Sequence, residues 1–353
     1  MLVRKNIADL PAYIAGKATD NKKIIKLNSN ECPFEPPCAI YRRAAKIRRI
    51  NRYHEASGLK LREEIALELG LSAEWVVLGN GSGELIKTYL EAFVDKNQEV
   101  VIADVTFSLY RLYSHIYDAA IKTIPISDDL RLNLSAWADS VDEKTGAVFL
   151  VNPNNPTGEF FSYEELRKVF EKIPPRVGIF LDEAYIHYSD ESKIQGFKDL
   201  LISFPNLFIL RTFSKVGLAG IRMGYGIARP DLISVMHKVR PPFNTNVYAQ
   251  ELSISLCREK KYLRKIKKNN TIQKESLSAG LKALGLSVFP SEANFLLIKS
   301  RPGLHISLEK RGILIRNAQS FGLSADYYRI TIGTPLENRK LLAALGEVMQ
   351  CDD

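Results

Sequence analysis

Lys215 is the residue of this chain best placed to do covalent chemistry. It follows an apolar stretch, residues 207–210, that predicts a short buried strand, and Gly217, Gly220 and Gly224 after it should interrupt regular structure. A lysine forms imines with carbonyl compounds once desolvation or neighbouring cations lower its pKa. A lysine at a strand end is more often a solvated charge. The prediction of a Schiff-base lysine therefore depends on what the rest of the chain brings to it.

Groups that can bind a phosphate accompany this lysine. One set lies where a predicted strand, residues 75–78, passes through a glycine turn into a predicted helix, residues 85–93. Backbone N–H groups are free at a helix N-terminus, and glycines let an anion approach them closely. The turn fits neither the dinucleotide fingerprint nor the Walker A pattern, and a plain tight turn is the alternative. The predicted phosphate ligands are Gly81, Ser82 and Gly83 of this turn, together with Thr212, Ser214 and Arg222 near the lysine.

Four further residues could hold a ring bound to Lys215. If the lysine carries pyridoxal phosphate, an anionic partner must keep the pyridine nitrogen protonated, and Asp182 after a buried strand can do so. Asn155 and Tyr185 could hold the phenolic oxygen, and Phe107 could cover the face of the ring. Each has an ordinary structural alternative: a helix cap or ion pair for the aspartate, a turn for the asparagine, and packing for the two aromatic rings.

These residues require elements that bring them to one edge of a sheet. Between residues 75 and 228, apolar strands alternate with helical patterns, and Ser162 and Glu165 have the spacing of a capping box. This alternation predicts an α/β fold with a mostly parallel central sheet and helices on both faces, whose ligands bind beyond the carboxyl ends of the strands. The other predicted strands are residues 99–105, 121–126, 147–151, 177–181 and 223–228, and further predicted helices start at Ser57 and Phe107.

The pattern changes after residue 243, where a long charged helical region begins. The elements predicted there are this region to about Leu284, short strands at 287–289, 294–298, 313–315 and 328–331, and a terminal helix over 336–349. The sequence thus predicts three parts. An N-terminal arm, residues 1–40, packs with the small domain; residues 41–243 form a large cofactor-binding α/β domain; residues 244–353 form a small α+β domain.

Composition favours a soluble protein that handles anionic small molecules. The chain has 353 residues and a net charge of +9, and its four cysteines show no zinc-like spacing with its five histidines. We predict reduced thiols, no metal site and, because residues 1–26 are rich in charge, a cytoplasmic location with no membrane partner. The basic run 258–268 could bind nucleic acid, but a solvated helix face is the simpler interpretation, so no nucleic-acid partner is predicted.

Several segments resemble those of a known family. Asn-Pro-Asn-Asn-Pro-Thr-Gly at 152–158, Leu-Asp-Glu-Ala-Tyr at 181–185 and Arg-Thr-Phe-Ser-Lys at 211–215 are similar to motifs of fold-type-I pyridoxal-phosphate aminotransferases. More closely, the chain resembles the histidinol-phosphate aminotransferases. This resemblance also rests on Lys-Leu-Asn-Ser-Asn-Glu-Cys-Pro-Phe at 26–34, Arg-Tyr at 52–53 and Arg-Ile-Thr-Ile-Gly at 329–333.

The resemblance implies roles that the residues alone do not. Arg329, assisted by Arg316, would bind the acidic group of the substrate, and Asn30 would lie over the substrate. Tyr53 would reach the cofactor phosphate of the other subunit in a homodimer with shared active sites, and Lys215 would also move the substrate proton. The implied reaction is transamination of L-histidinol phosphate with 2-oxoglutarate in histidine biosynthesis, which gives imidazole acetol phosphate and glutamate.

Other functions stay open on the sequence. An aromatic-amino-acid aminotransferase would use Arg329 for a carboxylate, and a threonine-phosphate decarboxylase would bind a phosphorylated substrate without consuming an oxo acid. A regulator that only senses pyridoxal phosphate would need a DNA-binding module, for which the arm leaves no room. The chain also departs from the family. The step from Lys215 to Arg222 is one residue shorter than usual, His54 replaces a usual proline and Cys32 a common asparagine.

Overall fold

The computed structural model describes residues 2–21 and 23–350, in which the apolar runs form a seven-stranded sheet. The strand order is β2-β8-β7-β6-β5-β3-β4, and neighbouring strands are parallel except where β8 pairs with β2 and β7. The predicted α/β fold with a mostly parallel sheet is therefore confirmed. The strands are β2 (Val76–Asn80), β3 (Glu99–Ala103), β4 (Ala120–Ile124), β5 (Thr145–Val151), β6 (Gly178–Asp182), β7 (Leu207–Thr212) and β8 (Met223–Ala228).

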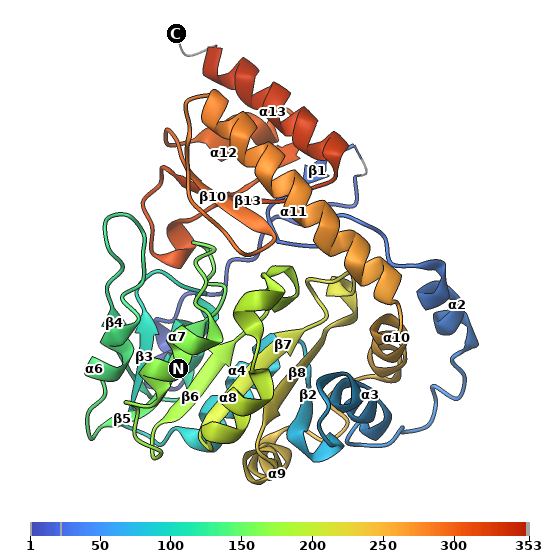
Figure 1. Cartoon of the computed structure of the whole chain (residues 1–353), viewed down its shortest axis with the longest axis vertical. Coiled ribbons are helices and arrows are strands. Elements are labelled where there is room, and N and C mark those ends of the chain that lie inside the picture. The colour runs from blue at the N-terminus through green and yellow to red at the C-terminus, as the bar shows by residue number, and fades with distance from the viewer. Residues whose placement is uncertain (1, 22, 351–353) are drawn as a thin grey trace.

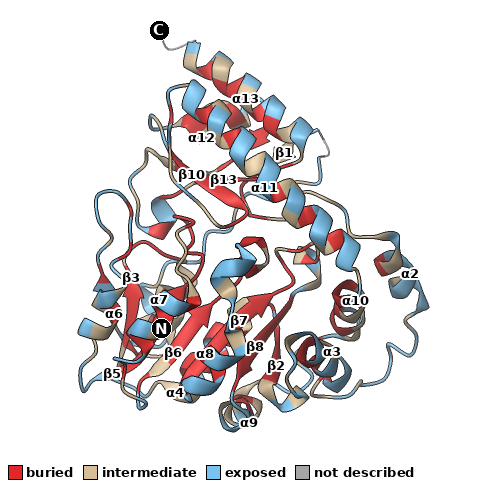
Figure 2. Cartoon of the chain, in the orientation of Figure 1, coloured by how far each residue is buried: buried red, intermediate tan, exposed pale blue. Residues whose placement is uncertain are grey.

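Two hydrophobic cores lie on the two faces of this sheet. Along β5, Val148 and Leu150 belong to one core, whereas Ala147, Phe149 and Val151 belong to the other, as alternation along a strand requires. Helices cover both faces and leave the strands buried (Figure 2), which explains their continuous apolar sequence. The helices are α2 (Cys38–Lys46), α3 (Leu59–Leu69), α4 (Ser82–Phe93), α5 (Leu109–Ile116), α6 (Ser135–Asp139), α7 (Tyr163–Phe170), α8 (Phe197–Ser203), α9 (Pro230–Val239) and α10 (Val247–Cys257).

A smaller α+β unit stands on one side of the large domain, and a long helix, α11, reaches from one to the other (Figure 1). The sheet of this smaller unit has four antiparallel strands in the order β12-β13-β10-β9. The core combines Leu277 and Leu281 of α11 with Ile330 of β13 and Leu345 of α13. The elements are α11 (Lys260–Ala283), β9 (Ser287–Val288), β10 (Phe295–Lys299), α12 (Leu304–Glu309), β11 (Ile313–Leu314), β12 (Arg316–Asn317), β13 (Tyr327–Thr331) and α13 (Pro335–Gln350).

The N-terminal arm contacts both parts of the molecule. Its strand β1 (Ile25–Lys26) pairs in parallel with β11 of the small domain. At its start, next to α1 (Lys5–Ala8), Arg4 forms an ion pair of 3.0 Å with Asp118 of the large domain. Since α2 already begins at Cys38, the proposed limit of the arm at residue 40 falls inside a helix. The division into three parts remains a prediction.

Local backbone conformation explains where the predicted elements were misplaced. The helix predicted from Ser57 begins at Leu59, because Gly58 adopts a left-handed conformation (φ 67°) immediately before it. α4 begins at Ser82, so the glycine turn leads directly into the first helical turn. The predicted interruption at Gly224 is wrong, since this glycine lies inside β8, where a Cβ would come within 2.7 Å of the Ser82 nitrogen. The capping box of Ser162 and Glu165 is confirmed.

The structure also gives information on membrane-spanning helices, on the cysteine thiols and on the basic run 258–268. No helix in residues 2–21 and 23–350 is both long and apolar enough to cross a membrane. Cys32, Cys38 and Cys257 are free thiols, and Cys351 lies outside the described residues. Basic side chains of the run 258–268 form ion pairs with the large domain, which fits a solvated helix face. These pairs are Arg258–Glu64, Lys260–Glu68 and Lys267–Glu191.

Candidate active site

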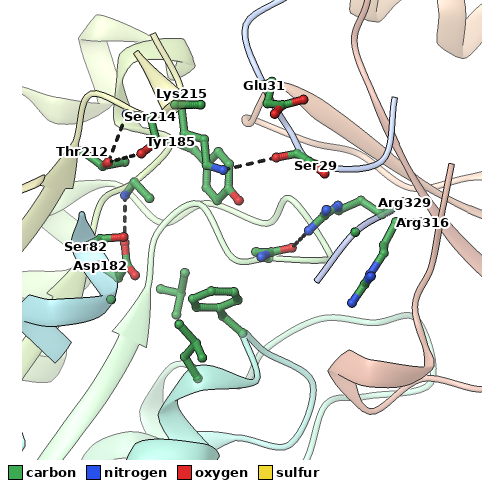
Figure 3. A pocket seen from close by; sticks show the side chains of 18 of the residues that line it. Ser29, Glu31, Ser82, Asp182, Tyr185, Thr212, Ser214, Lys215, Arg316 and Arg329 are labelled. Atoms are coloured by element: carbon green, nitrogen blue, oxygen red, sulfur yellow. Dashed lines mark hydrogen bonds between the residues drawn. The ribbon is translucent and has the colours of Figure 1, made fainter. Parts of the chain in front are cut away.

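The polar residues that follow the strands converge on one cavity. β5, β6 and β7 are parallel neighbours, and the register places Val151 beside Asp182 and Asp182 beside Leu210. A cavity of about 410 Å³ lies beyond these strand ends and is bordered by residues of the arm and both domains (Figure 3). The predicted site residues in its lining are Ser82, Gly83, Phe107, Asn155, Asp182, Tyr185, Thr212, Ser214, Lys215, Arg222, Arg316 and Arg329.

Lys215 lines this cavity, and its amine extends toward Ser29 of the arm (Figure 3). Its Nζ donates a hydrogen bond of 3.3 Å to the carbonyl of Ser29 and lies 5.6 Å from the centroid of the Tyr185 ring. Burial and, to a smaller extent, the charge of Arg329 lower the pKa of Lys215 to about 8. Part of the amine is therefore neutral near pH 7, which is the form that attacks carbonyl carbons.

Asp182 is a buried carboxylate with two hydrogen-bond donors. The Tyr110 hydroxyl donates to its Oδ2, and the Ala184 N–H donates to its Oδ1 at 2.9 Å. Burial raises the pKa of Asp182 to about 6, and the two hydrogen bonds act in the opposite direction. At pH 7 the group is mostly ionised but poorly solvated, which suits a cationic partner. Tyr110 was not predicted from the sequence, although it lies three residues after Phe107 in a predicted helix, a spacing that places two side chains on one helix face.

Two hydrogen bonds connect the small domain and the arm to the candidate ring-binding residues. Nη1 of Arg329 donates to Oδ1 of Asn155 at 2.6 Å, and Nδ2 of Asn30 donates to the hydroxyl of Tyr185 at 3.0 Å. Asn30 is buried, and through this bond it holds Tyr185, which lines the cavity. Its position over the substrate stays a prediction.

The guanidinium groups of Arg316 and Arg329 extend toward the cavity from the small domain (Figure 3). Nη2 of Arg329 donates to the carbonyl of Asn28 at 2.9 Å, and Nη2 of Arg316 donates to the carbonyl of Ile14 at 2.7 Å. Burial lowers the pKa of Arg329 to about 10, so this group remains a cation at neutral pH. For its Nε no hydrogen-bond partner occurs in the described part of the chain, and the two groups together can bind an anion.

The candidate phosphate site is assembled despite the short step between Lys215 and Arg222. Nη1 of Arg222 lies 3.4 Å from Oγ of Ser214, and a Cβ on Gly81 would come within 2.4 Å of Nη2 of Arg222. Arg222 therefore reaches the N-terminus of α4. It does so in a left-handed backbone conformation (φ 62°). This conformation turns the chain back toward the turn before α4.

Tyr53, like Asn30 and Gly81, is a predicted site residue that does not line the cavity. Its side chain is 85% exposed and stacks on Phe243, with 4.6 Å between the ring centroids. Its role on a second subunit stays a prediction.

Comparison with known proteins places the chain in a family. It matches the description of aminotransferase class I and II over residues 22–345, and it belongs to that family. Two relatives are named histidinol-phosphate aminotransferases. One, from Carboxydothermus hydrogenoformans, is 35% identical, and the match covers 99% of each chain. The other, from Symbiobacterium thermophilum, is 34% identical, and the match covers 98% of this chain and 99% of the relative.

A solved structure shows the same fold. It is histidinol-phosphate aminotransferase from Sinorhizobium meliloti in complex with pyridoxal-5'-phosphate, with a TM-score of 0.90 and 24% sequence identity. The comparison covers 100% of this chain and 98% of that chain. This structure shows the fold, and the two full-length relatives confirm the resemblance to histidinol-phosphate aminotransferases that the sequence motifs indicated.

Proposed function

We propose that this protein binds pyridoxal phosphate and transfers the amino group of L-histidinol phosphate to 2-oxoglutarate, giving imidazole acetol phosphate and glutamate. The observation that carries the proposal is the convergence of Lys215, Asp182 and Arg329 on one cavity. These are an amine with a lowered pKa, a buried carboxylate and a buried arginine. The names of the full-length relatives direct the choice of substrate.

The cavity residues fit this cofactor. Gly81 lets the guanidinium group of Arg222 approach the turn before α4, and Gly224 of β8 lets this strand lie against the same turn, since Cβ atoms there would come within 2.4 Å of Arg222 and 2.7 Å of the Ser82 nitrogen. A phosphate would therefore be held by the N–H groups of Ser82 and Gly83, the hydroxyls of Thr212 and Ser214, and Arg222. Asp182 would bind the ring nitrogen, Asn155 and Tyr185 the phenolic oxygen, and Phe107 one face of the ring.

The side chains of the cavity would have separate roles in the reaction. When bound, pyridoxal phosphate supplies an electron sink that stabilises negative charge on the substrate carbon bearing the amino group. The neutral Nζ of Lys215 can take the proton from that carbon and return it, because its pKa of about 8 lies near the working pH. Asp182 keeps the ring nitrogen cationic, and Tyr185 is held by Asn30 at 3.0 Å.

The two arginines support an anionic substrate. Arg329 is already oriented by Asn155 and Asn28, so little side-chain entropy is lost when it binds a phosphate. Arg316 is partly exposed beside it and can add a second cation. Guanidinium groups bind phosphate oxygens bidentately, which a single ammonium group cannot do.

We also propose a homodimer with shared active sites in the cytoplasm. The support for the dimer is Tyr53, whose exposed ring stacks on Phe243, itself 37% exposed. Other apolar side chains of the same part of the sequence are also exposed: 54% for Tyr41, 68% for Ile50 and 78% for Leu67. The support for the location is the three free thiols of the described residues.

The substrate is tested by absorbance spectroscopy. The purified protein, loaded with pyridoxal phosphate, is titrated with L-histidinol phosphate in the absence of any oxo acid. We expect the visible band of the bound cofactor to decline while a near-ultraviolet band rises at micromolar concentrations. A response only to phenylalanine or tyrosine would instead indicate an aromatic-amino-acid aminotransferase, and release of CO2 from phosphothreonine a decarboxylase. No visible band after addition of the cofactor would refute the proposal.

Shared sites are tested by mixing two inactive variants. Lys215→Ala and Tyr53→Ala homodimers are unfolded together and refolded as a mixture. If Tyr53 acts on the other subunit, a hybrid has one site with both residues intact, and up to about a quarter of the wild-type activity should return. Activity that stays at the level of the unmixed variants would contradict shared sites.

A further inference from the structure

The first turn of α11 binds the arm just after the part that borders the cavity. The hydroxyl of Tyr262 donates to the carbonyl of Phe34 at 3.1 Å and lies 3.3 Å from Sγ of Cys32. One turn further on, Nζ of Lys265 lies over the Phe34 ring, 4.4 Å from its centroid. Tyr262 is 7% exposed and is not among the residues that line the cavity. Two residues of α11 thus hold one residue of the arm.

The same hydroxyl touches the loop that carries Lys215. A Cβ on Gly217 would lie 2.5 Å from the Tyr262 oxygen, and Gly217 has a φ of +108°. The glycine therefore allows the tyrosine to pack directly on this loop. On the neighbouring side, the hydroxyl of Tyr188 donates to the carbonyl of Lys215 at 2.5 Å. Tyr262 consequently contacts the arm and the lysine loop with one polar atom.

The arm contacts three residues that line the cavity, so a contact that fixes the arm also fixes their positions. The carbonyls of Asn28 and Ser29 accept hydrogen bonds from Arg329 and Lys215, and Asn30 donates to Tyr185. Upstream, the arm is fixed to the small domain through Thr331, whose N–H donates to Leu27 at 2.9 Å. Downstream of Asn30, the contacts to α11 at Cys32 and Phe34 are the corresponding anchor.

We propose that Tyr262 is a positioning residue that ties the arm to the Lys215 loop and so orients Lys215, Tyr185 and Arg329 without touching the substrate. The expected effect of Tyr262 on KM rests on the proposed transamination, whereas its expected effect on the hydrogen exchange of the arm and the loop does not. Cys32 and Gly217 both lie next to this hydroxyl. The contact therefore stabilises the arm and the lysine loop together.

Hydrogen exchange followed by mass spectrometry tests the mechanical claim in the protein without added cofactor. Tyr262→Phe keeps the ring and removes the hydroxyl. We expect peptides spanning residues 27–34 and 213–222 to exchange about fivefold faster. This factor corresponds to about 1 kcal/mol, the contribution of one hydrogen bond. The matched control is Tyr328→Phe. Its buried hydroxyl donates to the carbonyl of Arg301 at 2.9 Å and accepts from the N–H of Leu304 at 3.2 Å, on the far side of the small domain sheet from Arg329.

A double-variant comparison tests the shared contact. Cys32→Ala removes the sulfur next to the hydroxyl. If the two groups act through their contact, Cys32→Ala should change the exchange rates in the wild type but not in the Tyr262→Phe variant. In the active enzyme, Tyr262→Phe should raise KM for the amino substrate about fivefold with kcat within twofold, whereas Tyr328→Phe should change neither. Unchanged exchange in both segments, or equal acceleration in all peptides, would overturn the proposal. Absence of transaminase activity in the wild type would refute the proposed function alone, because the exchange result would still decide the role of Tyr262.

Discussion

Arg329 and Asn155 form a hydrogen bond of 2.6 Å between Nη1 and Oδ1, across the boundary between the small and the large domain. Arg329 is the central residue of β13, and Asn155 lies in the loop after β5. The residue that would bind the acidic group of the substrate is thereby connected to a residue that would hold the cofactor ring. A shift of the small domain must change both contacts together.

Substitution of Arg329 by lysine should weaken substrate binding strongly. Lysine keeps the charge but loses the fork that contacts Asn155, Asn28 and an incoming anion. We expect KM for L-histidinol phosphate to rise about 100-fold, equivalent to about 2.7 kcal/mol of charge-assisted hydrogen bonding. Arg316→Lys is the matched control and should cost less, because its guanidinium group is partly exposed. Equal effects of the two substitutions in steady-state kinetics would contradict the assigned order of importance.

Substitution of Tyr110 by phenylalanine should weaken cofactor binding. It removes the hydroxyl donor to Asp182, so the pKa of this carboxyl, already raised by burial to about 6, should rise further. Less of the group is then ionised at pH 7. We expect an increase of about tenfold in the Kd of pyridoxal phosphate, measured by fluorescence titration, and a shift of the acidic limb of the activity profile to higher pH. Tyr89→Phe, in the same aromatic cluster and beside Gly178, should leave both unchanged.

Capture of pyridoxal phosphate by the cofactor-free protein should depend on pH through Lys215. Only the neutral amine reacts, and a pKa lowered from 10.5 to about 8 means that its fraction rises up to about pH 9 and then levels off. The rate of appearance of the visible band should therefore increase between pH 7 and 9 and be nearly constant above it. Stopped-flow absorbance gives this rate. A rate that continues to rise to pH 10.5 would show that the fold does not lower this pKa.

The buried ion pair between Glu183 and Arg211 should govern stability next to the site. Their side chains are 0% and 10% exposed with an N–O distance of 2.8 Å, and Tyr163 donates to Glu183 at 2.7 Å. Arg211→Met leaves the Glu183 charge unpaired and should cost about 3–5 kcal/mol. The double variant with Glu183→Leu should recover much of this loss.

The measurement for this ion pair is the shift of the urea midpoint. The control is Lys168→Met, which breaks an exposed pair with Glu164 and should leave the midpoint nearly unchanged. A single variant as stable as the wild type would show that water or relaxation compensates the buried carboxylate.

Much of the candidate site could be predicted because its residues follow strands that have a local signature. Asp182, Asn155 and Lys215 each come directly or shortly after an apolar run, and parallel strands bring their carboxyl ends to one edge. The glycine turn before α4 was likewise visible as a break between a strand and a helix. What was missed at this edge, Tyr110, lies on a helix whose facing direction depends on how it packs against the sheet.

The sequence by itself determined the α/β class, the lysine and the residues at the strand ends, because hydrophobic periodicity and turn residues act over a few positions along the chain. Only the tertiary structure decided that Arg329 meets Asn155, that Asn30 holds Tyr185, and that Tyr262 joins the arm to the lysine loop. The first two contacts join residues 174 and 155 positions apart. Such contacts depend on how two domains and an arm pack together, and no local pattern in the chain encodes that packing.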